Sequence, residues 1–300
     1  MLRWRLIIGT VLVAMLLGLC WLDAHAARPG IYLFFLGLVV CVLAVEELVA
    51  MFRAIGHDPH RVTIHAGALA TFCAACASIL WPQNWTFEPL VGLSYGMAVG
   101  FALNVLIEIF RYRAPGKSIN DLALASFAII YIGGMLGFFV QLRMLPVGGD
   151  VARGGMLALF SMFAVVKFTD IGAYFAGHRW GRHKMAPVIS PGKTWEGAAG
   201  GLALGVVMAM FTLGPLARMM NVPSQRGWLA WLGGAIAYGL IVSAAGMIGD
   251  LAESLLKRDA GMKDSSTWLP GFGGVLDLLD SLLFAAPVAY FLWISGIASP

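Results

Sequence analysis

The chain has 300 residues, of which 60% are hydrophobic and only 12% are charged, and its mean hydropathy is +0.83. Soluble domains are usually about 45–50% apolar and about 25% charged, so this composition excludes an ordinary soluble protein and favours an integral membrane protein. The formal net charge of +4 is modest, and no basic run is interleaved with aromatic residues, so no nucleic-acid partner is predicted.

Nine stretches of mainly apolar residues follow one another, each about as long as a membrane-spanning helix. They are predicted at about 5–22, 31–52, 62–81, 89–110, 121–140, 156–177, 197–214, 229–249 and 275–297. The first stretch could instead be a signal peptide, because Ala24-His25-Ala26 weakly resembles a cleavage site, but we predict an uncleaved span. The predicted fold is an all-α polytopic transmembrane bundle. Residues 1–160 would form N-terminal spans of unassigned role, and residues 161–300 would form spans that carry a cytoplasmic-side site.

The positions of the basic residues predict an orientation. If the N-terminus lies in the cytoplasm, the cytoplasmic segments hold 14 of the 20 Lys and Arg residues, the opposite side holds five, and Lys167 lies within a span. Cytoplasmic loops of membrane proteins carry an excess of Lys and Arg. The distribution therefore predicts nine spans with the N-terminus inside and the C-terminus outside, in a bacterial cytoplasmic (inner) membrane.

Cys73 and Cys76 form a C-x-x-C pair, a spacing that metal and redox sites use. Both lie in an apolar stretch, and no second pair accompanies them. We therefore predict that they are buried small hydrophobic residues, and no disulfide framework is expected.

Acidic residues lie within or close to the predicted spans, where an ionised side chain costs about 2.5–3.5 kcal/mol at mid-membrane. If the spans alternate as predicted, most of these residues lie near one membrane surface. The acidic residues near that surface are Glu46, Glu47, Glu108, Asp170, Asp250, Asp277 and Asp280. The glutamates are equally well explained as residues that mark where a helix leaves the membrane. The aspartates, taken with their neighbours, predict a site on the cytoplasmic side.

The segment from Ser190 to Thr194 precedes the seventh predicted span and contains the Gly-Lys-Thr of a P-loop. It is not a P-loop, because Pro187 stands where that motif needs glycine and no preceding strand is expected. A lysine and hydroxyls at a helix N-terminus nonetheless favour a bound phosphate. The alternative is a structural helix cap with a solvated lysine.

The region between the last two predicted spans carries the strongest pattern. If residues 250–258 are helical, Asp250, Ser254 and Lys257 share one face at i, i+4 and i+7. Asp277 and Asp280 share a face at i and i+3. Carboxylates grouped with cations, without a His or Cys cluster, suit Mg²⁺ shared with substrate phosphates. The pattern predicts phosphoryl or nucleotidyl transfer.

Residues 254–281 resemble the signature of the phosphatidate cytidylyltransferases, also called CDP-diacylglycerol synthases. The matching positions are Ser254, Lys257, Arg258, Lys263, Asp264, Pro270, Gly271, Gly273, Gly274, Asp277, Asp280 and Ser281. Segments 169–174 and 190–197 also resemble blocks of that family. The resemblance implies that CTP and phosphatidate react to give CDP-diacylglycerol and diphosphate, with Mg²⁺, in an all-helical membrane bundle that can form a homodimer.

The pattern and the resemblance together predict a role for each candidate residue. Asp250, Asp277 and Asp280 would hold Mg²⁺, alone or with a second cation. Catalytic roles are predicted for Lys257, Arg258, Ser254 and Asp170. Substrate-binding roles are predicted for Lys193, Ser190, Thr194, Lys263, Gly273 and Gly274. The predicted partners are CTP, phosphatidic acid or a related lipid phosphate, and membrane lipids.

Two positions depart from the family pattern, which usually has histidine where this chain has Phe272 and arginine where it has Leu278. They predict a divergent member with an altered lipid substrate or slower turnover. Two alternatives stay open: a CTP-dependent lipid kinase of the polyprenol type, which would release CDP, and a non-catalytic lipid-binding relative. A transporter is disfavoured, because transporters place polar residues near the bilayer midplane in paired repeats, and no repeat is visible here.

Overall fold

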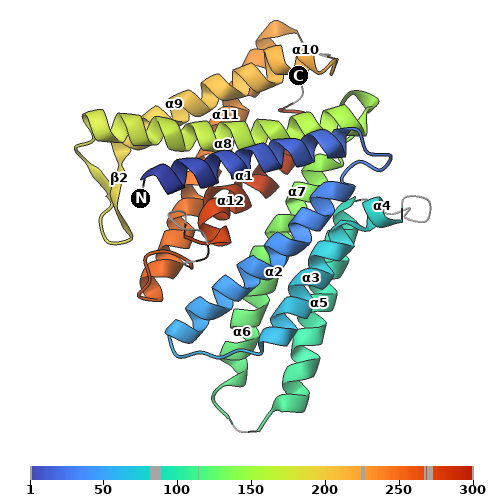
Figure 1. The fold of residues 1–300 in the computed structure, drawn as a ribbon, viewed down its shortest axis with the longest axis vertical. Helices are drawn as coiled ribbons and strands as arrows, with labels where there is room; N and C mark the ends of the chain where they lie inside the picture. Colours follow the sequence, from blue (N-terminus) through green and yellow to red (C-terminus); the bar gives the residue numbers. More distant parts are fainter. Residues whose placement is uncertain are drawn as a thin grey trace. The chain divides into compact units, whose positions relative to one another are not determined.

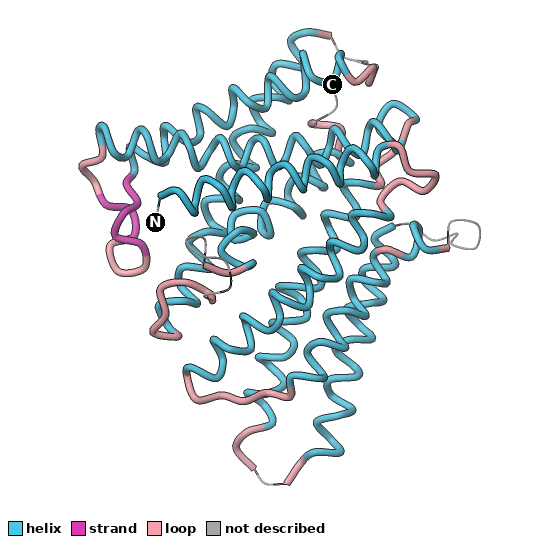
Figure 2. The backbone as a smooth tube through the Cα atoms, in the orientation of Figure 1, coloured by secondary structure: helices cyan, strands magenta, loops and turns pink. Residues whose placement is uncertain are grey.

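A computed structural model describes residues 2–81, 89–113, 115–223, 227–266, 268 and 273–298, which are mostly helical (Figures 1 and 2). A helical segment lies at each predicted span. The helices are α1 (Leu2–Ala24), α2 (Ile31–Ala54), α3 (Arg61–Ala75), α4 (Ala77–Leu80), α5 (Pro89–Arg111), α6 (Ser118–Ala128), α7 (Met135–Arg143), α8 (Val151–Trp180), α9 (Trp195–Phe211), α10 (Ala217–Met219), α11 (Trp228–Asp259) and α12 (Val275–Ile294). Two π-helical turns, Ile129–Gly134 and Thr212–Leu216, continue α6 into α7 and α9 into α10, and a 3₁₀ turn spans Val147–Gly149.

Seven helical stretches among the described residues are long and apolar enough to cross a membrane. The first of them is α2. The helical stretch from α6 to α7 is counted as one, and so is the stretch from α9 to α10. The predicted span at about 62–81 is divided instead into α3, which has 15 residues, and the short α4. The all-α bundle of a multi-pass membrane protein is therefore confirmed, while the number of nine spans and their orientation stay predictions.

The chain forms two compact units, and each is described by itself. The first unit comprises residues 1–141 and 256–278, and the second comprises residues 142–255 and 279–300. Helices α11 and α12 each contribute to both units. This division does not test the roles predicted for residues 1–160 and 161–300, which stay predictions.

In the first unit, α3 packs against α5 and against the π-helical turn Ile129–Gly134. A side chain at Gly100 would lie 3.0 Å from the carbonyl oxygen of Gly67, so these glycines let the backbones of α3 and α5 approach closely. Small residues serve the same purpose in membrane helix pairs generally. Cys76 is buried, as predicted, whereas Cys73 is only partly buried, and all four cysteines are free thiols.

In the second unit, α8 packs along α9 through small residues. Gly197, Gly201 and Gly205 are spaced by four and face α8, and a side chain at Gly201 would lie 2.8 Å from the Thr169 carbonyl oxygen. The hydroxyl oxygens of Thr169 and Ser243 lie 2.6 Å apart and join α8 to α11. This packing fixes the end of α8 that carries Asp170.

Two short strands stand between α8 and α9. Strand β1 (Lys184–Ala186) pairs antiparallel with β2 (Ser190–Thr194), with Lys184 opposite Thr194 and Ala186 opposite Ser190 (Figure 2). The prediction that no strand precedes the Gly-Lys-Thr segment was therefore wrong. The strands are too short, and β2 is too rich in Pro and Gly, to give a strand pattern in the sequence. Pro187 still excludes a P-loop.

Candidate active site

The second unit contains an ion pair between two of the predicted site residues. Lys193 projects from β2, and its Nζ lies 2.7 Å from Oδ2 of Asp250 on α11. The two side chains are 21% and 30% exposed, but the Lys193 Nζ atom itself is buried against Asp250. The Ser254 hydroxyl donates to Oδ1 of Asp250 at 3.4 Å, which confirms that these two residues share a face of α11.

Two further aspartates lie near this pair. Asp170 on α8 interacts electrostatically with Asp250, with Asp280 on α12 and with Lys193. Its nearest cation is Lys167, whose Nζ lies 3.7 Å from Oδ2. A side chain at Gly249 would lie 2.5 Å from the Asp280 carbonyl oxygen, so this glycine lets α11 approach α12 beside Asp250. We call the residues Lys167, Asp170, Lys193, Asp250 and Asp280 the Lys193 cluster.

The hairpin that carries Lys193 is anchored at its base. The Thr194 side chain accepts a hydrogen bond from the Gly197 backbone N–H at 3.1 Å and so caps α9. Glu196 accepts from the His183 ring Nδ1 at 2.6 Å and from the backbone N–H groups of Arg182 and His183. Thr194 therefore has the structural cap role that the sequence left as an alternative, and its predicted role in substrate binding stays a prediction.

The first unit holds the other group of site residues. Lys257, in the last turns of α11, donates from Nζ to Oδ1 of Asp277 at 2.6 Å, and the side chains are 12% and 11% exposed. Oδ2 of Asp277 accepts from the Ser265 backbone N–H at 2.8 Å, from the Ser265 hydroxyl at 2.7 Å and from the Gly274 N–H at 2.8 Å. Both oxygens of Asp277 are therefore engaged by protein donors.

A buried glutamate of α2 contacts the same loop. Glu47 accepts hydrogen bonds from Ser265, Ser266, Val275 and Leu276. We call the residues Glu47, Lys257, Ser265, Ser266 and Asp277 the Glu47 cluster. Sequence reasoning did not select Glu47 as a site residue. Two sequence signals were available: an acidic residue within a predicted span, and the Ser265-Ser266 pair in the loop that leads to α12.

The donor chemistry of the Lys193 cluster fits Mg²⁺. Among the residues that the structure describes, no three His, Cys, Asp or Glu side chains are close enough together to hold a metal ion by themselves. Mg²⁺ at nucleotide sites usually takes only one or two carboxylates and completes its shell with water and substrate phosphates. Three interacting aspartates facing Lys167 and Lys193 carry an excess negative charge that a cation would neutralise.

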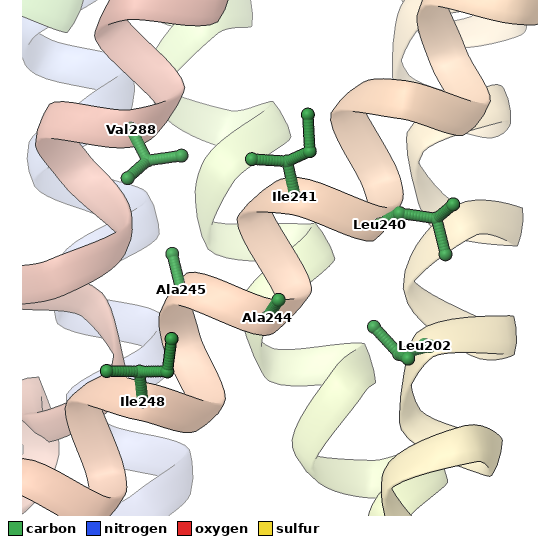
Figure 3. Close-up of a pocket in the computed structure, with 7 residues that line it drawn as sticks. All are labelled: Leu202, Leu240, Ile241, Ala244, Ala245, Ile248 and Val288. Atoms are coloured by element: carbon green, nitrogen blue, oxygen red, sulfur yellow. The ribbon is translucent and has the colours of Figure 1, made fainter.

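An apolar groove of about 480 Å³ lies in the second unit (Figure 3). Its lining comes from α9, α11 and α12 and consists of Leu202, Leu240, Ile241, Ala244, Ala245, Ile248 and Val288. Most of these residues lie on α11, and Ile248 precedes Asp250 by two positions on that helix. Residues two positions apart lie on nearly opposite faces of a helix, so the groove and Asp250 occupy different sides of α11.

The remaining predicted residues lie in three places. Ser190 begins β2, and Arg258 lies in the last turn of α11. Lys263 is exposed in the loop after α11, and Gly273 and Gly274 stand just before α12. Gly273 has a φ of +86°, a conformation that favours glycine.

Leu278 lies on α12, whereas Phe272 falls outside the described residues. The metal-binding set of Asp250, Asp277 and Asp280 and the other assigned roles stay predictions.

Comparison with known proteins identifies the family. Residues 3–295 match the model of the Cytidylyltransferase family. The chain is 34% identical to a phosphatidate cytidylyltransferase of Bacillus subtilis, with 71% of this chain and 75% of the relative covered. It is 32% identical to one of Pseudomonas aeruginosa over the full length of both chains, and 41% identical to one of Haemophilus influenzae, with 68% and 70% covered. The chain therefore belongs to the cytidylyltransferase family and is a nucleotidyltransferase.

Proposed function

We propose that this protein is a phosphatidate cytidylyltransferase of a bacterial inner membrane, which makes CDP-diacylglycerol for phospholipid biosynthesis. The observation that carries the proposal is the Lys193 cluster, in which partly exposed aspartates of α8, α11 and α12 lie together with two lysines. The names of the relatives point to the same reaction. We place the site at the cytoplasmic surface, where soluble CTP and the head group of a membrane lipid can meet.

The reaction needs no nucleophile from the protein. A phosphate oxygen of phosphatidate forms a bond to the α-phosphorus of CTP. The bond from that phosphorus to the oxygen that bridges to the β-phosphorus breaks, and diphosphate leaves with the electron pair. Catalysis of this kind depends on positioning and on stabilising negative charge.

The residues of the Lys193 cluster divide these tasks. Lys193 would bind triphosphate oxygens through its ammonium group after leaving Asp250, and Asp250 would hold Mg²⁺ with Asp280 or Asp170 in support. Bound Mg²⁺ would neutralise charge on the triphosphate. Lys167 would supply further positive charge for the lipid phosphate or the diphosphate, and the catalytic role predicted for Arg258 in the first unit stays a proposal. Lys257 and Asp277 hold each other in place, and the metal role of Asp277 and a second cation remain part of the proposal.

The apolar groove is the proposed contact surface for an acyl chain of the lipid (Figure 3). Aliphatic side chains cover it, and it runs along α11 to within two residues of Asp250. Asp250 lies on nearly the opposite face of α11, so the groove accounts for contact with an acyl chain and not for the position of the lipid phosphate. An aliphatic contact surface agrees with a lipid as the acceptor and with the surrounding membrane lipids as its source.

The test is diphosphate release by the purified full-length protein in detergent with CTP, Mg²⁺ and phosphatidate, leaving out each component in turn. The proposal predicts release that needs all three components, with one CDP-lipid formed per diphosphate. Release of CDP in place of diphosphate would identify a lipid kinase. CTP binding without any release, by protein that remains folded, would identify a non-catalytic relative.

A further inference from the structure

Two adjacent glutamates of α2 have different surroundings. The Glu46 side chain is 34% exposed, and its Oε1 lies 3.5 Å from Nη2 of Arg61 and 3.3 Å from the His65 ring. Glu47 is buried, with only 5% of its surface exposed. The sequence does not distinguish the two, but among the described residues Glu47, and not Glu46, contacts the loop that precedes α12.

Four donors converge on the Glu47 carboxylate. Ser266 Oγ and the Val275 N–H donate to Oε1 at 3.0 and 2.8 Å. The Leu276 N–H donates to Oε2 at 2.8 Å, and Ser265 Oγ lies 2.9 Å from the same oxygen and shares its one hydroxyl proton between Glu47 and Asp277. A carboxylate has about four lone-pair sites, and every one of these partners is a donor. Glu47 is therefore satisfied as an anion by protein groups.

Two of these donors are the first backbone N–H groups of α12. Helix N-termini leave such groups without partners within the helix, and their dipole favours an anion. Glu47 thus caps α12 from another helix, and the two serine hydroxyls attach the preceding loop to the same carboxylate. A side chain at Gly274 would collide with the Glu47 carboxylate and with Ser265 Oγ, which explains the glycine there.

The Ser265 hydroxyl links Glu47 to the predicted site. Ser265 Oγ lies 2.9 Å from Oε2 of Glu47 and 2.7 Å from Oδ2 of Asp277. Asp277 is in turn paired with Lys257. Ser266 differs, because it contacts Glu47 and no bond from it to Asp277 is present in this part of the chain. The position of Asp277 and Lys257 therefore depends on Glu47 through Ser265.

We propose that Glu47 is a positioning residue for nucleotidyl transfer, holding Ser265, Ser266 and the first turn of α12 so that Asp277 and Lys257 are correctly placed. This inference rests on the proposed function, because it gives Asp277 and Lys257 a part in that reaction. Glu47 contacts neither substrate nor metal in this role, since its oxygens are already engaged.

The first test replaces each glutamate by its isosteric amide. In Glu47→Gln, an NH₂ group faces donors that need an acceptor, so we expect kcat to fall about 100-fold, the scale of a small misplacement of reacting groups. The KM for CTP should change less than about threefold, because CTP binding is assigned to Lys193. The matched control, Glu46→Gln, should keep kcat within about twofold, because the ion-pair partners of Glu46 in the described part of the chain are Arg61 and His65.

The second test separates positioning from general stability. Ser265→Ala and Ser266→Ala each remove one hydroxyl from Glu47, but only Ser265→Ala removes the link to Asp277. We expect similar shifts in Tm and a fall in kcat about tenfold larger for Ser265→Ala. Equal kcat values in the two serine variants would overturn the proposal, and this comparison decides the matter if Glu47→Gln does not fold.

Hydrogen exchange measured on the full-length protein in detergent gives a readout that does not depend on activity. The amides of Val275 and Leu276 should exchange faster in Glu47→Gln than in the wild type or Glu46→Gln. Unchanged exchange, or normal turnover in Glu47→Gln beside an active wild type, would overturn the positioning role alone. A wild-type protein that releases no diphosphate would overturn the proposed function and this inference with it.

Discussion

The Lys193 cluster and the Glu47 cluster contain the same kinds of charged residue in different surroundings. In the Glu47 cluster, Asp277 is 11% exposed and Lys257 is 12% exposed, and protein donors occupy the oxygens of both carboxylates. In the Lys193 cluster, the ion-paired side chains are 21–44% exposed. The Glu47 cluster holds its own chain in place, whereas the Lys193 cluster has partly exposed carboxylates and the half-exposed Lys167, which a cation and incoming phosphates can use. Lys193 becomes available to a phosphate only when it leaves Asp250, because its Nζ is buried.

This difference separates charges that maintain the structure from charges that act on a ligand. Breaking a buried pair leaves an uncompensated charge, so it costs stability. Exposed pairs contribute only about 0–1 kcal/mol to folding, so their loss should be felt mainly in function. The following variants test that separation.

The largest effect is expected for Asp250→Asn. This change removes the charge that the proposal assigns to Mg²⁺ and that now pairs with Lys193. We expect kcat/KM to fall on the order of 10³-fold, as when an essential electrostatic group is removed, with Tm nearly unchanged. Diphosphate release and thermal unfolding of the same preparation measure both quantities. Activity within tenfold of the wild type would remove Asp250 from the metal site.

Lys193→Gln should mainly weaken CTP binding. A charge-assisted hydrogen bond contributes about 1.5–3 kcal/mol, so the KM for CTP should rise about 10- to 100-fold. Lys184→Gln is the matched control, because Lys184 is an exposed lysine on the partner strand of the same hairpin. Steady-state kinetics with varied CTP give the answer. Equal effects of the two substitutions would show that the hairpin contributes only general positive charge.

Asp277→Asn should lower stability as well as activity. The amide cannot accept from Lys257 and also satisfy the donors that face Oδ2. Losing one partner of a buried pair costs about 3 kcal/mol, which lowers Tm by about 5–10 °C in a chain of this size. Thermal unfolding compared with Asp250→Asn is the measurement. The contrast between the two clusters would be wrong if Asp250→Asn lowered Tm as much as Asp277→Asn.

The smallest effect is expected for Thr194→Ala, which removes the cap of α9. Loss of an N-cap costs about 1 kcal/mol, or about 2–4 °C in Tm. Thr194→Ser keeps the hydroxyl and should restore Tm. If Thr194→Ala left Tm unchanged and raised the KM for CTP more than tenfold, Thr194 would bind substrate instead of capping the helix.

Much of the fold follows from the sequence, because long apolar stretches have few alternatives to helices in a membrane. Helix α11 begins close to the start of the apolar stretch predicted at 229–249. It continues through Asp250 and Ser254, which the predicted helical face required. The division of the span at about 62–81 was not predicted, since an apolar run does not reveal where a helix is interrupted at Cys76.

The charged residues of the candidate site could be selected from the sequence, but their partners could not. Spacing selected Asp277 and Lys257 as candidates, whereas their pairing joins residues of two different helices that are 20 positions apart in the chain. Glu47 lies more than 200 residues before Ser265, and no local pattern links the two. Long-range hydrogen bonds of this kind depend on tertiary structure, so the structure was needed to separate Glu47 from Glu46.

The most direct test of the central claim is to follow the α-phosphate of CTP. Wild-type protein and Asp250→Asn would each be given CTP labelled at the α-phosphorus, with Mg²⁺ and phosphatidate, and the label in the lipid would be measured. We predict labelled lipid with the wild type and a loss on the order of 10³-fold with the variant, both remaining folded. Unlabelled lipid with the wild type, or transfer of a γ-phosphate label in its place, would contradict the account.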